Sequence, residues 1–181
     1  MNGKRLEIMK LKSLWVIVIM IVVSSCGNTS KQEDNKLTTF YFIRHAEKVK
    51  DQGNDPELTP SGISRANQWV NYFFLKDVDR ILSSDYKRTR QTAAPLAKSK
   101  KLPIEIYDVR SLNGDSLLNK YKGETVVLYG HSNTINSYTN DLQSDSIYKE
   151  LDEKDYNHFF KVQIDNNGKS RAQKLAMDFI E

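Results

Sequence analysis

From Thr38 onward, short apolar runs of strand length alternate with segments whose apolar residues recur at helical spacing. The segments predicted as strands are Thr39–Ile43, Arg80–Ser83, Ile104–Tyr107 and Thr125–Tyr129. The segments predicted as helices are one that starts at Thr59-Pro60 and runs to Phe74, then Lys87–Lys100, about Leu117–Lys122, and Ser132–Leu142. Strands that alternate with helices indicate right-handed βαβ crossovers and a parallel sheet. We therefore expect an α/β fold, a three-layer sandwich with a mostly parallel central sheet flanked by helices.

The C-terminal part has a different pattern, which predicts an antiparallel hairpin at the edge of the sheet. Two strand candidates, His158–Asp165 and Ser170–Phe179, flank the segment Asn166-Asn167-Gly168. Asparagine followed by glycine favours a tight turn between two strands, because both residues tolerate positive φ. We expect a C-terminal hairpin that is closed by this Asn-Gly turn.

The N-terminal segment has the pattern of a targeting sequence. Basic residues up to Lys12 precede Leu14–Val23, an apolar run of ten residues, whereas a membrane-spanning helix needs about 20. Such a run followed by small residues is typical of a secretory signal peptide. Val23-Ser24-Ser25-Cys26 also resembles the lipobox of bacterial lipoproteins, in which the cysteine is acylated and becomes the new N-terminus after cleavage.

We therefore expect residues 1–25 to be a lipoprotein signal peptide, Cys26 to be lipidated, and residues 26–37 to form a flexible tether. The folded domain would then comprise residues 38–181. The alternative is a short uncleaved anchor with an incidental cysteine. Under both interpretations the domain lies in the cell envelope, anchored to a membrane and facing the periplasm or the exterior.

Composition and charge narrow the function classes. The chain has 181 residues, of which 39% are hydrophobic and 28% charged, as in an ordinary globular domain. The net charge of +4 is mostly carried by the first 25 residues, which hold four basic residues against one acidic residue. The domain itself is nearly neutral, so we expect no nucleic-acid partner. Cys26 is the single cysteine, which excludes an intramolecular disulfide and a zinc site built from several thiolates.

Residues able to bind an anion follow three of the predicted strands. Arg44-His45 comes directly after the first strand, Arg88 follows the second, and His131 ends the strand at Thr125–Tyr129. The carboxyl ends of parallel strands meet at one edge of a sheet, where α/β proteins bind their ligands. Two guanidiniums and two imidazoles suit a phosphoryl dianion. An isolated arginine–histidine pair would more simply be a surface pair, so the convergence of three strand ends carries the prediction.

Four motifs in chain order identify a resemblance. They are Arg44-His45-Ala46-Glu47-Lys48, Leu58-Thr59-Pro60-Ser61-Gly62-Ile63-Ser64-Arg65-Ala66, the segment from Ser83 to Ala93 (SSDYKRTRQTA), and Gly130-His131-Ser132. In these four motifs and their order, the sequence resembles the histidine phosphatase superfamily, also called the phosphoglycerate mutase-like family. The resemblance covers most of residues 39–142 and implies a phosphoglycerate mutase-like fold. The small size and the lack of a cap insertion resemble the compact SixA-like phosphohistidine phosphatases.

The resemblance implies that His45 is the nucleophile and forms a phosphohistidine. A neutral imidazole can attack phosphorus if a hydrogen bond holds its second nitrogen and fixes the tautomer. Arg44, Arg88 and a protonated His131 would neutralise the charge on the phosphoryl oxygens. These cationic side chains make a metal or another cofactor unnecessary. Arg90 lies two positions from Arg88 and so on a different helix face, which places it outside the expected pocket.

The general acid is left open. The family motif that carries a glutamate after the third strand is absent, and Asp108 stands in the comparable place. Glu47 and His131 are the other candidates for the proton donor. Asp108 could equally be a solvated carboxylate or a helix cap. His158 has no motif around it and is interpreted as a surface histidine.

We expect a metal-independent phosphatase that hydrolyses phosphomonoesters or phosphoproteins through a phosphohistidine intermediate. Its partners would be a phosphorylated small molecule or a phosphoprotein, together with the membrane that receives the lipid on Cys26. Two alternatives are a catalytically silent lipoprotein that binds phosphorylated ligands and a phosphotransferase of the phosphoglycerate mutase type. Turnover of a generic aryl phosphate in the presence of a chelator would separate the silent protein from the enzyme.

Overall fold

The structure is a computed structural model, and it describes residues 36–143 and 145–177. The elements in this part of the chain are β1 Thr38–Arg44, α2 Pro60–Tyr72, β2 Arg80–Ser84, α3 Lys87–Lys100, β3 Ile104–Tyr107, α4 Gly114–Lys120, β4 Thr125–Gly130, α5 Ser132–Asp141, β5 His158–Ile164 and β6 Ser170–Ala176. The predicted signal peptide, Cys26 and nearly all of the tether lie outside the described residues. Within the described ranges, no helix is long and apolar enough to cross a membrane.

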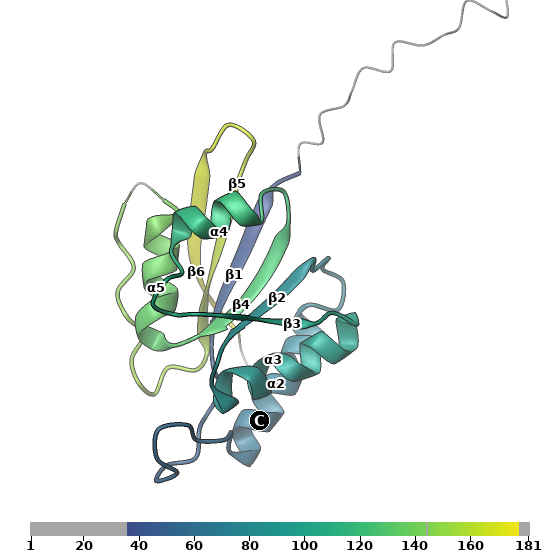
Figure 1. Ribbon diagram of the computed structural model, residues 1–181, viewed down its shortest axis with the longest axis vertical. Helices are drawn as coiled ribbons and strands as arrows, with labels where there is room; N and C mark the ends of the chain where they lie inside the picture. The colour runs from purple at the N-terminus through teal and green to yellow at the C-terminus, as the bar shows by residue number, and fades with distance from the viewer. Residues whose placement is uncertain (1–35, 144, 178–181) are drawn as a thin grey trace, which may run out of the picture. The chain divides into compact units, whose positions relative to one another are not determined.

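The strands form one sheet in the order β3-β2-β4-β1-β5-β6. The first four strands of that order are parallel, and β5 and β6 add an antiparallel edge. Helices α2 and α3 cover one face of the sheet, whereas α4 and α5 cover the other (Figure 1). The predicted three-layer α/β sandwich with a mostly parallel sheet and a C-terminal hairpin is therefore confirmed.

Strand β1 shows why the sheet has two cores. Phe40 and Phe42 point to the face covered by α4 and α5, whereas Tyr41 and Ile43 point to the face covered by α2 and α3. All seven residues of β1 are buried. A strand covered on both faces has no polar alternate positions, which explains its continuous apolar sequence.

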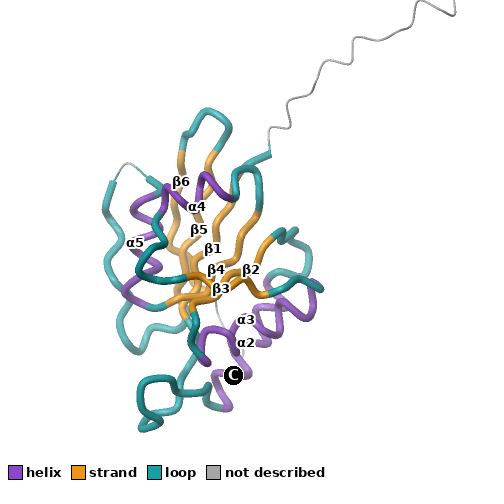
Figure 2. Tube along the Cα trace, in the orientation of Figure 1, coloured by secondary structure: helices purple, strands orange, loops and turns teal. Residues whose placement is uncertain are grey.

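Strands β1, β2 and β4 lie side by side in the sheet (Figure 2), and their register brings the predicted site residues to one edge. Arg44 at the end of β1 pairs with Gly130 at the end of β4, and Ser83 in β2 pairs with Tyr129. The amide of His45 donates to the carbonyl of Gly130 at 2.9 Å. His45 and the residue after Gly130 therefore leave the sheet side by side.

The start of α2 is fixed as its sequence predicts, and it supports the segment that follows β1. Thr59 is the N-cap, and its Oγ1 accepts a hydrogen bond from the amide of Gly62 at 3.0 Å, with Pro60 as the first helical residue. A Cβ at Gly62 would collide with the carbonyl oxygen of Glu47. The glycine thus allows the helix to approach the backbone beside the predicted nucleophile.

Two predicted details differ from the structure. Helix α4 begins earlier than expected, because Asn113 and Ser116 form a capping box around its first turn. The hairpin is closed by a longer loop than a two-residue Asn-Gly turn. Asp165 and Lys169 remain hydrogen-bonded, and only Gly168 in this loop has positive φ, at 79°.

Candidate active site

A cavity of about 400 Å³ lies at the carboxyl ends of β1, β2 and β4. The structure brings Arg44, His45, Arg88 and His131 together in its lining. The rings of His45 and His131 lie 5.5 Å apart between their centroids. Residues far apart in the chain thus form one cationic cluster at the edge where an α/β sheet binds ligands.

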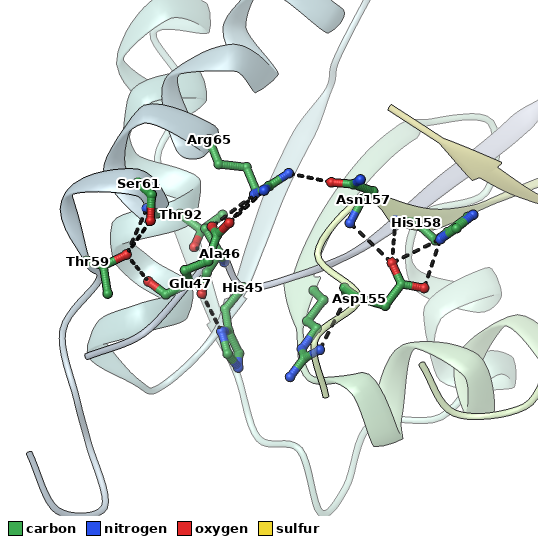
Figure 3. A network of polar contacts seen from close by, with 12 residues as sticks. His45, Ala46, Glu47, Thr59, Ser61, Arg65, Thr92, Asp155, Asn157 and His158 are labelled. Atoms are coloured by element: carbon green, nitrogen blue, oxygen red, sulfur yellow. Dashed lines mark hydrogen bonds and ion pairs between the residues drawn. The ribbon is translucent and has the colours of Figure 1, made fainter. Parts of the chain in front are cut away.

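His45 is held as a neutral imidazole with one defined tautomer. Its side chain is almost fully buried, and Nδ1 lies 2.8 Å from the carbonyl oxygen of Ala46 (Figure 3). Since a carbonyl can only accept, Nδ1 carries the proton and Nε2 keeps its lone pair. Burial lowers the pKa of His45 to about 3, and the positive charges nearby act in the same direction against the Ala46 hydrogen bond. The imidazole is therefore a neutral potential nucleophile at neutral pH.

The backbone next to His45 is anchored to helix α3. The amide of Ala46 donates to Oγ1 of Thr92 at 3.0 Å, and this hydroxyl donates in turn to the carbonyl of Arg88 at 2.7 Å. Ala46, whose carbonyl orients His45, is therefore bound through its amide to the helix that carries Arg88. This contact holds His45 and Arg88 in a fixed relation.

His131 also carries a defined tautomer. Ser84 Oγ donates to Thr89 Oγ1 at 3.0 Å, so it accepts from Nε2 of His131, also at 3.0 Å. The bare Nδ1 then faces Nη2 of Arg88 at 3.4 Å. Burial, followed by Arg88 and the other positive neighbours, lowers the pKa of His131 to about 4. In the free protein this shift favours the neutral ring at pH 7, so the expected protonation of His131 would depend on the negative charge of a bound phosphoryl group.

The two arginines present buried donors to the cavity. Arg44 is 8% exposed, and its Nη1 donates to the carbonyls of Asp152 and Asp155 at 2.8 and 3.2 Å. The Arg88 guanidinium carbon lies 4.4 Å from the centre of the Tyr86 ring. Nε of each arginine is buried and finds no hydrogen-bond partner among the described residues. The two guanidinium charges in the lining favour an anion with several acceptor oxygens.

The structure does not place Asp108 or Glu47 with these residues. Asp108 is half-exposed and lines a neighbouring cavity, where its carboxylate accepts from Arg110 at 3.2 Å. These hydrogen bonds lower the pKa of Asp108, so its carboxyl group is ionised at neutral pH and carries no proton to donate. The carboxylate of Glu47 is bound by Arg65 at 2.6 to 2.9 Å (Figure 3). Asp108 lines a different cavity from His45, which argues against the general-acid role that the sequence left open for it.

Sequence reasoning missed the part of the lining that comes from the segment before β5. Glu150 and Glu153 line the cavity, and Glu150 accepts from Ser132 Oγ at 3.1 Å. Tyr156 lies against the Arg44 guanidinium, with 4.5 Å between its ring centre and the guanidinium carbon. This segment has no motif, and its contacts with Arg44 and with helix α5 bring it to the site.

Two further predicted residues lie away from the cavity lining. His158 is half-buried, and its Nδ1 lies 2.8 Å from the carboxylate of Asp155. Arg90 pairs with Asp85. In the described ranges, no group of three or more His, Cys, Asp or Glu side chains could hold a metal ion.

Comparison with known families gives one match. Residues 40–109 match the family model of the histidine phosphatase superfamily, branch 1. This range contains Arg44, His45 and Arg88, while His131 comes from the part beyond it. A search of curated proteins gives no significant match.

Several solved structures share the fold. The protein histidine phosphatase SixA in complex with tungstate is 17% identical with a TM-score of 0.61, over 76% of this chain and 96% of SixA. A mycobacterial glucosyl-3-phosphoglycerate phosphatase is 12% identical with a TM-score of 0.60, over 77% and 98% of the two chains. A phosphoserine phosphatase from Entamoeba histolytica, bound to phosphoserine, is 17% identical with a TM-score of 0.53, over 71% and 95%. At these identities the likeness concerns the fold.

Proposed function

We propose that the chain is a member of the histidine phosphatase superfamily, whose branch 1 model matches residues 40–109, and that it is a metal-independent phosphatase with His45 as its nucleophile. One observation carries the proposal. Nδ1 of His45 is held by the Ala46 carbonyl, which leaves Nε2 with its lone pair, and Arg44 and Arg88 line the same cavity. A binding protein would need the two arginines but no oriented neutral imidazole.

The proposed reaction has two steps. The phosphoryl oxygens bind Arg44 and Arg88, whose charges stabilise the transition state. Nε2 of His45 forms a bond to phosphorus while the bond to the leaving oxygen breaks. Water then attacks the phosphohistidine and releases inorganic phosphate, which restores the neutral His45.

The leaving oxygen needs a proton, and His131 is the predicted donor that lies in the cavity. Its Nδ1 faces the site, and a bound phosphoryl group would raise its pKa by supplying negative charge. A phosphomonoester has a second pKa near 6, so the monoanion can bring the proton with it. Glu150 and Glu153 are the carboxyls of the same lining. Replacing each in turn should show whether one of them shares this task.

We propose phosphomonoesters and phosphorylated proteins as the substrate class. The structural neighbours include a protein histidine phosphatase and a phosphoserine phosphatase, which supports both kinds of substrate. The proposed location is the cell envelope, with Cys26 as the lipid-modified residue that attaches the protein to a membrane. The support for this location is the pattern of residues 14–26 in the sequence.

The direct test is turnover of phenyl phosphate in the presence of a chelator. His45→Ala should reduce turnover to background, whereas His158→Ala should retain most of it, since His158 does not line the cavity. His131→Ala should lower the rate by roughly a hundredfold, as for a lost transition-state donor. Full activity of His45→Ala would refute the proposal.

A further inference from the structure

A second cavity, of about 500 Å³, adjoins the cavity that contains His45. Residues 85–86 after β2 and residues 106–110 at the end of β3 line it. Tyr86 and Val109 belong to the lining of both cavities. A molecule bound through its phosphoryl group at His45 could therefore extend past these two side chains into the second cavity.

The second cavity exposes apolar side chains. Ile106 is 50% exposed and Tyr86 is 37% exposed. Ile106 lies on β3, an edge strand, near the end of the sheet at which His45 and His131 emerge. A single exposed apolar residue needs no explanation, but two such residues in one cavity beside a catalytic cluster are typical of a ligand-binding wall.

The charged residues of the second cavity are already paired. Asp108 binds Arg110, and Asp85 binds Arg90 from helix α3. A carboxylate that is paired with an arginine attracts a charged ligand only weakly. With these charges paired, Tyr86, Ile106 and Val109 are the apolar contacts that the cavity offers a ligand, which favours an uncharged group over a cationic or an anionic one.

Tyr86 joins the two cavities in a defined orientation. The Arg88 guanidinium carbon lies 4.4 Å from the centre of its ring, and the ring of His131 meets it edge-on with centroids 5.0 Å apart. These contacts fix the ring next to the phosphoryl-binding residues. Aromatic rings bind other rings favourably in stacked or edge-to-face geometry.

We propose that the second cavity is a leaving-group subsite that takes an uncharged, flat aromatic group attached to the phosphoryl group. The first ring of the leaving group lies against Tyr86 and Val109, which line both cavities, and the second ring of a larger group reaches Ile106. The inference rests on the proposed phosphatase function, and it narrows the substrates to aryl phosphates and similar compounds.

The test compares 2-naphthyl phosphate with phenyl phosphate. The two leaving alcohols have similar acidity, so their difference in kcat/KM measures contact with the second ring rather than reactivity. We expect the wild-type protein to prefer 2-naphthyl phosphate by about tenfold, the size of a modest apolar contact. Ile106→Ser should reduce this preference to about twofold and leave kcat/KM for phenyl phosphate nearly unchanged.

Two variants separate lost contact from damage to the fold. Ile106→Leu keeps the apolar surface and should keep the preference. Ile63→Ser replaces an isoleucine of similar exposure, 53%, on helix α2, and it should also keep the preference. Equal kcat/KM values of the wild-type protein for the two substrates, or an undiminished preference in Ile106→Ser, would overturn the subsite while the phosphatase function stands. Failure to hydrolyse either substrate would overturn the phosphatase function and the subsite together.

Discussion

Replacing His45 by glutamine should make the folded domain less sensitive to acid. His45 is 4% exposed, and its pKa is lowered to about 3, whereas a histidine in an unfolded chain titrates near 6.5. Below about pH 6.5 the unfolded chain binds a proton at this position that the folded protein excludes until about pH 3. The free energy of unfolding of the wild-type protein therefore decreases as the pH falls from about 6.5 to about 3.

The magnitude follows from the two pKa values. Between pH 7 and pH 5 the unfolded imidazole becomes almost fully protonated, which lowers the free energy of unfolding by about 2 kcal/mol. Glutamine can still donate a hydrogen bond to the Ala46 carbonyl but does not titrate. His131, with a pKa of about 4, changes stability in the same direction in both proteins, so its effect cancels in the comparison.

Urea unfolding of the wild-type protein and His45→Gln at pH 7 and pH 5 provides the assay. Between these pH values, the free energy of unfolding of the wild-type protein should fall by about 2 kcal/mol more than that of the variant. Matching m-values would show that the same cooperative transition is compared. An equal loss in the two proteins would refute the buried neutral histidine.

Three further predictions concern separate parts of the chain. Arg65→Met should lower the free energy of unfolding by about 2 kcal/mol and reduce turnover, because it leaves the Glu47 carboxylate unpaired beside His45. Urea unfolding measures the loss of stability, and strict additivity of the effects of Arg65→Met and Glu47→Gln in the double variant would contradict the prediction. Asp108→Asn should change alkyl phosphate turnover by less than about twofold, since Asp108 pairs with Arg110 outside the cavity, and a hundredfold loss would restore it as the acid. Cys26→Ser should abolish labelling by a radioactive fatty acid, and a variant that remains labelled would disprove lipidation at this residue.

The elements of the central sheet could be predicted from local sequence, because each depends on short-range signals. The apolar runs of β1 and β4 and the Thr59-Pro60 helix start are examples. The parallel arrangement then placed Arg44, His45 and His131 at one edge without any knowledge of contacts. The start of α4 could have been found from its Asn-x-x-Ser capping box.

Other features of the site depend on contacts between distant residues and on burial. Arg44 binds the carbonyls of Asp152 and Asp155, more than a hundred positions away, and no local pattern marks that segment. The charge state of His131 depends on its burial beside Arg88 and on the hydrogen bond to Ser84. Asp108 matched its expected place along the chain, but Arg110 two residues later captures its carboxylate.

The central claim is that Nε2 of His45 carries the phosphoryl group during turnover. Rapid acid quenching would hydrolyse a phosphohistidine, so the protein should be mixed with ³²P-labelled phenyl phosphate, quenched in alkaline denaturant and digested. We predict a base-stable, acid-labile label on the peptide that contains His45, present in His158→Ala and absent from His45→Ala. Label on another residue, or undiminished label in His45→Ala, would contradict the assignment of His45 as the nucleophile.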